Sequence, residues 1–159
     1  MNILYTAFNG KNNSSKILLD KINTPNKLYL KNSFLTSTMQ LEKELKLNTY
    51  DLIISFGQSL LPLDTIKIET TGKNKEIYKT TYNYLLLKEK LKLNNYNVFI
   101  SDNAGNYLCN NIYFHGLKFI NKNNLKTKMI FIHIPKIKGI SNIDDLAAIF
   151  NENQIESLI

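Results

Sequence analysis

Apolar residues of this 159-residue chain gather in short runs that alternate with amphipathic segments. Runs rich in β-branched and aromatic residues are typical of strands, and we expect strands at residues 2–8, 27–30, 51–57, 64–70, 97–101 and 128–135. Apolar positions at helical spacing predict helices at 14–22, 38–45, 82–93, 106–119 and 143–151. Because serine is a favoured N-cap, we expect Ser14 or Ser15 to cap the first helix and Ser37 the second.

This order of elements predicts the fold class. Strands that alternate with helices favour βαβ units. The run "DLIISFG" (51–57) shows no polar alternation, which is the pattern of a strand buried on both faces. No repeat or Pro/Gly-rich linker divides the chain, and its length suits one domain. We therefore expect an α/β fold, a single-domain three-layer αβα sandwich around a mainly parallel sheet.

Three candidate chemical groups follow predicted strands at their carboxyl ends, where such sheets bind ligands. They are Gln58, Cys109 and His133. Cys109 should lie in the first turn of its helix, where unpaired backbone N–H groups lower the pKa of a thiol and can face an oxyanion; the alternative is an inert buried cysteine. His133 could serve as a general base or be a hydrogen-bonded core histidine. His115 lies six residues beyond Cys109 and should face away from it.

Composition argues against several classes of protein. The formal charge is +7, but all 20 basic residues are lysines and they are scattered, whereas arginine makes most bidentate contacts to guanine and phosphate. A solvated surface therefore explains the charge better than nucleic-acid binding. We expect no membrane partner, no signal peptide, no metal and no cofactor, because the matching patterns are missing. One cysteine permits no internal disulfide, which suits the cytoplasm.

Two segments of the chain resemble a known family. "SDNAGNYLCNNIYFHGL" (101–117) resembles S-N-S-A-G-x-Y-x-C-N, the nucleophile segment of the cysteine-class pyroglutamyl peptidases, or pyrrolidone-carboxylate peptidases. "FIHIP" (131–135) resembles their histidine segment, F-I-H-[VI]-P. "MNILYTAF" and "DLIISFGQ" are similar to the family's opening strand and to its strand ending in G-Q. The similarity runs in order to about residue 135, so residues 1–159 are expected to form one domain of this type.

The resemblance implies a role for particular residues. Cys109 would be the nucleophile and His133 the base. In "LPLDTIKIE" (61–69), Asp64 takes the place of the family's catalytic glutamate and Glu69 that of an asparagine. Phe8 matches a phenylalanine of the family's pyroglutamate pocket, and we assign Gln58 to substrate binding with it. The family's P-F-G-G turn, G-G-R loop and D-A-R-I-P-D-N stretch have no counterpart here.

The resemblance thus implies a cysteine hydrolase that removes N-terminal pyroglutamyl groups from small peptides. It also implies weak activity, no cofactor and a homo-oligomer. The chain would be a shortened, divergent member of the family. The alternative is a non-catalytic or substrate-altered member that serves as a binding or structural protein, favoured by the missing loops and opposed by the intact cysteine and histidine segments. Nucleic-acid binding is a third and weaker alternative.

Overall fold

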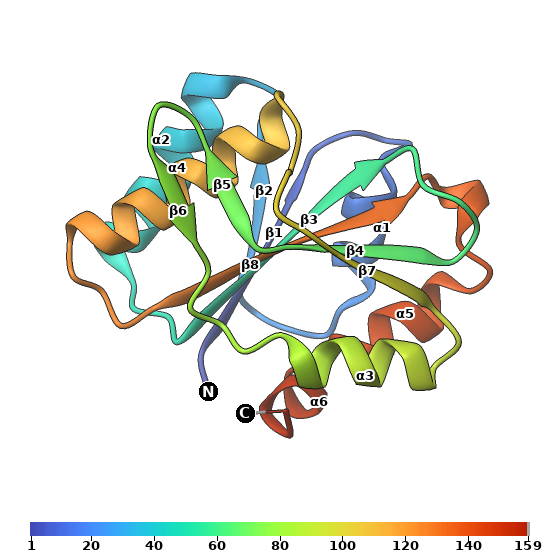
Figure 1. Cartoon of the computed structure of the whole chain (residues 1–159). Coiled ribbons are helices and arrows are strands. Elements are labelled where there is room, and N and C mark those ends of the chain that lie inside the picture. The colour runs from blue at the N-terminus through green and yellow to red at the C-terminus, as the bar shows by residue number, and fades with distance from the viewer. Residues whose placement is uncertain (159) are drawn as a thin grey trace.

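The computed structural model describes residues 1–158, which form a six-stranded mixed sheet with helices on both faces and a separate two-stranded hairpin (Figure 1). The sheet order is β2-β1-β3-β8-β4-β7. Its strands are β1 (Ile3–Phe8), β2 (Lys27–Leu30), β3 (Leu52–Ser59), β4 (Thr65–Glu69), β7 (Asn97–Ser101) and β8 (Lys128–Pro135). Strands β2, β1, β3 and β8 are parallel, whereas β4 runs antiparallel to β8 and carries β7 parallel to itself. The expected mainly parallel sheet is confirmed, with one reversed pair at its end.

Helices on the two faces of the sheet enclose two separate apolar clusters, which gives the expected three layers. One face is covered by α2 (Phe34–Leu47) and α4 (Leu108–Lys122). The other is covered by α1 (Ser14–Lys21), α3 (Leu85–Leu93), α5 (Ile143–Ile149) and α6 (Glu152–Glu156) (Figure 1). A single-turn 3₁₀ helix spans Ile137–Gly139. The layers follow from the sequence, because each strand and helix has an apolar side to bury.

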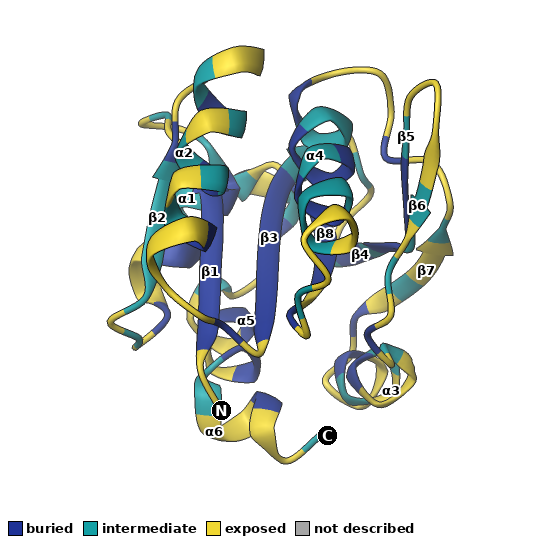
Figure 2. Ribbon diagram, turned by 90° about the vertical axis from the view of Figure 1, so that its left-hand side faces the viewer, coloured by how far each residue is buried: buried dark blue, intermediate teal, exposed yellow. Residues whose placement is uncertain are grey.

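The middle of the sheet is the most deeply buried part of the molecule. Strands β1, β3 and β8 are buried over almost their whole length, whereas the edge strand β7 is largely exposed (Figure 2). The unbroken apolar runs of the central strands suit this position, because helices cover both of their faces. Chemistry that needs a dry, rigid setting is therefore best placed at the carboxyl ends of β3 and β8.

Several predicted boundaries and caps are wrong in detail. Asn13 caps α1, because its side chain accepts the backbone N–H of Ser15. Ser33, not Ser37, caps α2, which begins one turn earlier than expected. A hairpin of β5 (Thr71–Lys73) and β6 (Ile77–Lys79) was not predicted, because its strands are too short to show alternation. No helix within residues 1–158 is long and apolar enough to cross a membrane.

Candidate active site

Cys109 is held by a tight loop and a helix start. Between β7 and α4, the Asn103 side chain accepts the backbone N–H of Gly105, whose φ of +89° is a left-handed conformation that favours glycine. The loop then enters α4 at its N-cap Tyr107, and Cys109 is the second helical residue. No side chain caps this helix start within the part of the chain described. The expectation that Cys109 lies in the first turn is confirmed, and backbone N–H groups remain free there.

The thiol of Cys109 lies directly on the carboxyl end of β3. A Cβ atom built on Gly57 would come within 2.7 Å of Cys109 Sγ and 2.8 Å of the Phe131 ring. Only glycine leaves room for sulfur at this position, since such contacts are far inside van der Waals distance. Gly57 is also the register partner of His133 on the neighbouring strand β8. The Cys109 thiol and His133 therefore lie on the same face of the sheet, the one that α4 covers, near the carboxyl ends of the neighbouring strands β3 and β8.

The carboxylate partner of His133 is Glu69, the last residue of β4. Glu69 Oε1 lies 2.8 Å from His133 Nδ1, and the Glu69 side chain has no exposed surface. The antiparallel register pairs Glu69 with Phe131, so that its side chain reaches His133 diagonally on the same face. Nδ1 is thus the ring nitrogen that faces the acid, which leaves Nε2 as the ring nitrogen available to a reacting group. Cys109, His133 and Glu69 form the cluster with the composition of a nucleophile, a base and an orienting acid.

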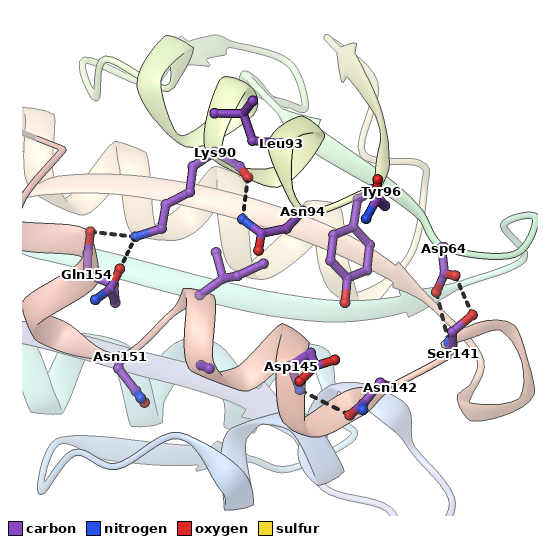
Figure 3. A pocket seen from close by; sticks show the side chains of 13 residues that line it. Asp64, Lys90, Leu93, Asn94, Tyr96, Ser141, Asn142, Asp145, Asn151 and Gln154 are labelled. Atoms are coloured by element: carbon purple, nitrogen blue, oxygen red, sulfur yellow. Dashed lines mark hydrogen bonds between the residues drawn. The ribbon is translucent and has the colours of Figure 1, made fainter.

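Asp64 is not part of this cluster, and the expectation that it orients His133 is wrong. Its carboxylate accepts hydrogen bonds from the backbone N–H, at 2.8 Å, and the hydroxyl of Ser141 (Figure 3). The reason is strand geometry, because residues of β4 alternate between the two faces of the sheet. Asp64 precedes β4, where its φ of +48° interrupts the extended backbone, whereas Ile66 and Ile68 of β4 pack in the cluster beneath α1 and α5. Glu69 has the opposite parity, which brings it to His133.

The two expected substrate-binding residues lie in different places. Phe8 is buried at the end of β1 in the apolar cluster against which Cys109 packs, so it lies on the face of the thiol. Gln58 Oε1 instead accepts the backbone N–H of Ser14 at 2.9 Å, at the start of α1. Since α1 packs on the other face, the Gln58 side chain serves the helix start and is not directed to Cys109. The structure brings Phe8, but not Gln58, to the thiol's side of the sheet.

Electrostatics around the thiol differ from the sequence expectation. Burial raises the pKa of Cys109 from 9.0 to about 12, and the negative charge of Glu69 acts in the same direction. The expected lowering by the helix start is therefore outweighed, and the resting thiol is protonated near neutral pH. The pKa is raised because packing against Gly57 of β3 excludes water from the sulfur. The nucleophile must lose its proton to a neighbouring base as it reacts.

His115 lies elsewhere on α4, as its spacing predicted. It is half-buried in a hollow lined also by Glu42 and Lys118, and burial lowers the pKa of its imidazole. Among residues 1–158, no three His, Cys, Asp or Glu side chains come together in a group that could hold a metal ion. The cluster of Cys109, His133 and Glu69 is therefore the best candidate for an active site.

Comparison with known proteins identifies the family of this chain. The sequence model of the pyroglutamyl peptidase family matches residues 68–148, just over half of the chain, including Glu69, Cys109 and His133. The chain belongs to the pyroglutamyl peptidase family. Pyrrolidone-carboxylate peptidase 2 of Caldanaerobacter subterraneus subsp. tengcongensis is 38% identical over 74 residues, which are 46% of this chain and 34% of the relative. Pyrrolidone-carboxylate peptidase 1 of the same organism is 34% identical over 89 residues, 56% of this chain and 42% of the relative.

Solved structures share the fold of this pyroglutamyl peptidase family member. Pyroglutamyl peptidase I from Bacillus amyloliquefaciens superposes with a TM-score of 0.82 at 18% identity, over 92% of this chain and 89% of that chain. Pyrrolidone carboxyl peptidase from Pyrococcus furiosus gives 0.78 at 21% identity, over the whole of both chains. The chain's sequence match spans less than half the length of the two curated relatives. The fold is thus kept throughout, while detectable sequence likeness is confined to part of the chain.

Proposed function

We propose that this protein is a cysteine hydrolase that removes N-terminal pyroglutamyl groups from peptides. The observation that carries the proposal is the His133 Nδ1–Glu69 Oε1 hydrogen bond of 2.8 Å at the sheet edge where Cys109 lies. A nucleophile, a base and an orienting acid within one buried cluster are the parts that acyl transfer needs. Membership of the pyroglutamyl peptidase family supplies the substrate class.

In the first step, Cys109 Sγ attacks the carbonyl carbon that links pyroglutamate to the next residue. His133 Nε2 takes the thiol proton as the bond forms, and Glu69 steadies the resulting imidazolium through Nδ1. The free backbone N–H groups at the start of α4 stabilise the negative charge on the carbonyl oxygen. Collapse of this intermediate breaks the C–N bond, and His133 protonates the leaving amine. A thioester and the shortened peptide result.

In the second step, water hydrolyses the thioester. His133 removes a proton from the water, the oxygen attacks the thioester carbon, and the thiol of Cys109 leaves with that proton. Free pyroglutamate is the second product, and the protein returns to its starting state. No cofactor enters either step. Because the resting thiol is protonated, the proton transfer to His133 belongs to the reaction itself rather than to a preformed ion pair.

Pyroglutamate is a small neutral lactam, and the surroundings of the thiol suit it. Phe8 packs in the cluster beside Cys109 and supplies an apolar wall for the ring. A free thiol is required in both steps, so we place the activity in a reducing compartment such as the cytoplasm. A non-catalytic role has less support, because Glu69, His133 and Cys109 would then have no reason to share a buried site.

The proposal is tested with a pyroglutamyl amide that carries a chromogenic leaving group. The unmodified protein should release the chromophore, and Cys109→Ala and His133→Ala should not. Glu69→Gln should lower kcat at least tenfold, because the imidazolium loses its counter-charge. An amide of glutamate, with an open side chain and the same leaving group, serves as the matched substrate control. Release that is equal for both substrates, or that survives Cys109→Ala, would overturn the proposal.

A further inference from the structure

A cation lies directly beside the His133–Glu69 pair. Lys67 of β4 is the register partner of His133 of β8, and side chains opposite each other on antiparallel strands project from the same face. Lys67 Nζ lies 3.9 Å from Glu69 Oε1. The Lys67 side chain is 35% exposed, whereas that of Glu69 is fully buried. The ammonium group therefore reaches from the solvent side toward a carboxylate that water does not reach.

The charge of Glu69 is poorly compensated by hydrogen bonds. Its Oε1 accepts from His133, but Oε2 is buried and has no hydrogen-bond partner within residues 1–158. Burying a carboxylate costs free energy unless nearby positive charge offsets it. The same negative charge also opposes formation of a thiolate at Cys109. An uncompensated Glu69 would thus orient His133 and at the same time hinder the nucleophile.

We propose that Lys67 is a positioning residue that acts through Glu69: its ammonium group offsets part of the carboxylate charge, so that Glu69 can hold His133 while opposing the ionisation of Cys109 less than a bare carboxylate would. The inference deepens the proposed function, because it takes Cys109 as the nucleophile. The inference rests on the Lys67–Glu69 contact and on the register of β4 on β8.

The balance of charge at the site is simple. Groups from three elements face the thiol or the carboxylate: Lys67 and Glu69 on β4, His133 on β8, and Cys109 with Tyr113 on α4. The Tyr113 hydroxyl is neutral and donates to the backbone oxygen of Glu69 at 2.9 Å. With a neutral imidazole, Lys67 and Glu69 sum to zero. Removing Lys67 leaves a net negative site, and removing both charges restores neutrality.

The test measures the alkylation rate of Cys109 by iodoacetamide between pH 7.5 and 10, followed by mass spectrometry, and needs no peptide substrate. Only the thiolate reacts, so the rate reports its population. Lys67→Met should slow alkylation about three- to tenfold, the effect of half to one pKa unit. Glu69→Gln should accelerate it by a similar factor, and the double variant should return to within about twofold of the unmodified rate. Lys67→Arg keeps the charge and should also stay within about twofold.

Lys128→Met is the matched control, because Lys128 is exposed at the opposite end of β8 and its loss changes the net charge equally. Circular dichroism and thermal melting identify any variant that fails to fold; if Lys67→Met does, Lys67→Gln carries the test with the same expected slowing. Equal slowing by Lys67→Met and Lys128→Met would overturn the inference. So would an unchanged rate in Lys67→Met, or a double variant as slow as Lys67→Met alone. The two proposals can fail independently. If alkylation follows the expected pattern but the protein does not hydrolyse the pyroglutamyl amide, the inference about Lys67 stands and the proposed function is rejected.

Discussion

Replacing Gly57 with alanine tests the placement of the thiol on β3. The new Cβ atom would meet Cys109 Sγ at 2.7 Å and the Phe131 ring at 2.8 Å, where ordinary contacts are about 3.5–4 Å. One of these groups must therefore move by about 1 Å. Both belong to well-packed elements, β8 and the first turn of α4. Overpacking of this kind destabilises a protein by about 1–3 kcal/mol.

Displacement of the sulfur should affect chemistry more than stability. A shift of about 1 Å in a reacting group can lower a rate about 100-fold. We expect Gly57→Ala to lower the urea midpoint without changing the slope of the unfolding transition, and to lower kcat on the pyroglutamyl amide about 100-fold. Intrinsic tryptophan is lacking, so circular dichroism follows unfolding.

Gly116→Ala provides the matched control. Gly116 lies on α4 as well, and its added Cβ would meet the flexible Met129 side chain rather than the thiol. It should change stability by a similar amount or less, since alanine also favours the helix by about 1 kcal/mol. Its effect on kcat should stay within a few-fold. If Gly57→Ala had the stability and the activity of the unmodified protein, Cys109 Sγ would not lie against β3 and the site geometry described above would be wrong.

Four further predictions concern the acid, a helix cap, the reactivity of the thiol and the pH dependence of stability. Asp64→Asn should leave kcat within about twofold, because Asp64 binds Ser141 and not the imidazole; a loss comparable to that of Glu69→Gln would restore Asp64 as the orienting acid. Asn13→Ala should lower the free energy of unfolding by about 1 kcal/mol in urea titrations through loss of the α1 cap, with kcat unchanged. Alkylation of Cys109 should rise about tenfold per pH unit from pH 7 to 10, because its pKa is about 12. The raised thiol pKa also predicts that stability falls as pH rises above about 9, the value in the unfolded chain. Cys109→Ala should lessen this fall between about pH 9 and 10, above which tyrosines with raised pKa values, such as Tyr82, add to it.

Much of the fold could be predicted from local patterns. The run 51–57 of β3 shows no polar alternation, which identified it as buried on both faces, and the alternation of strands with helices indicated the layers. The predicted helix caps were wrong, because a cap depends on local hydrogen bonding. Several polar residues precede α1 and α2, and the choice of Asn13 and Ser33 as caps depends on backbone geometry that the sequence does not reveal.

The site was predictable only in part. Cys109 and His133 follow strand patterns and a family motif, so sequence alone placed them together. Glu69 was missed because its role depends on β4 running antiparallel to β8, a pairing between segments more than sixty residues apart. One signal was available: in "DTIKIE", Asp64 shares its parity with two isoleucines, which marks it for the face opposite Glu69.

The pKa of the thiol could not be derived from position in the chain. A helix start lowers the pKa of a cysteine, but desolvation against Gly57 and Phe131 raises it and prevails. The same limitation applies to Lys67, whose place beside Glu69 follows from the register of β4 on β8. Both features arise from tertiary packing, which local propensity does not encode.

The most direct test of the central claim is detection of the covalent intermediate on Cys109. The protein is mixed with an activated pyroglutamyl ester, quenched with acid within milliseconds to seconds, digested and analysed by mass spectrometry. A pyroglutamyl thioester is expected on the peptide that contains Cys109, and no thioester is expected in Cys109→Ser. Turnover of the ester with an unmodified Cys109 peptide at every quench time, or acylation of another residue instead, would contradict it.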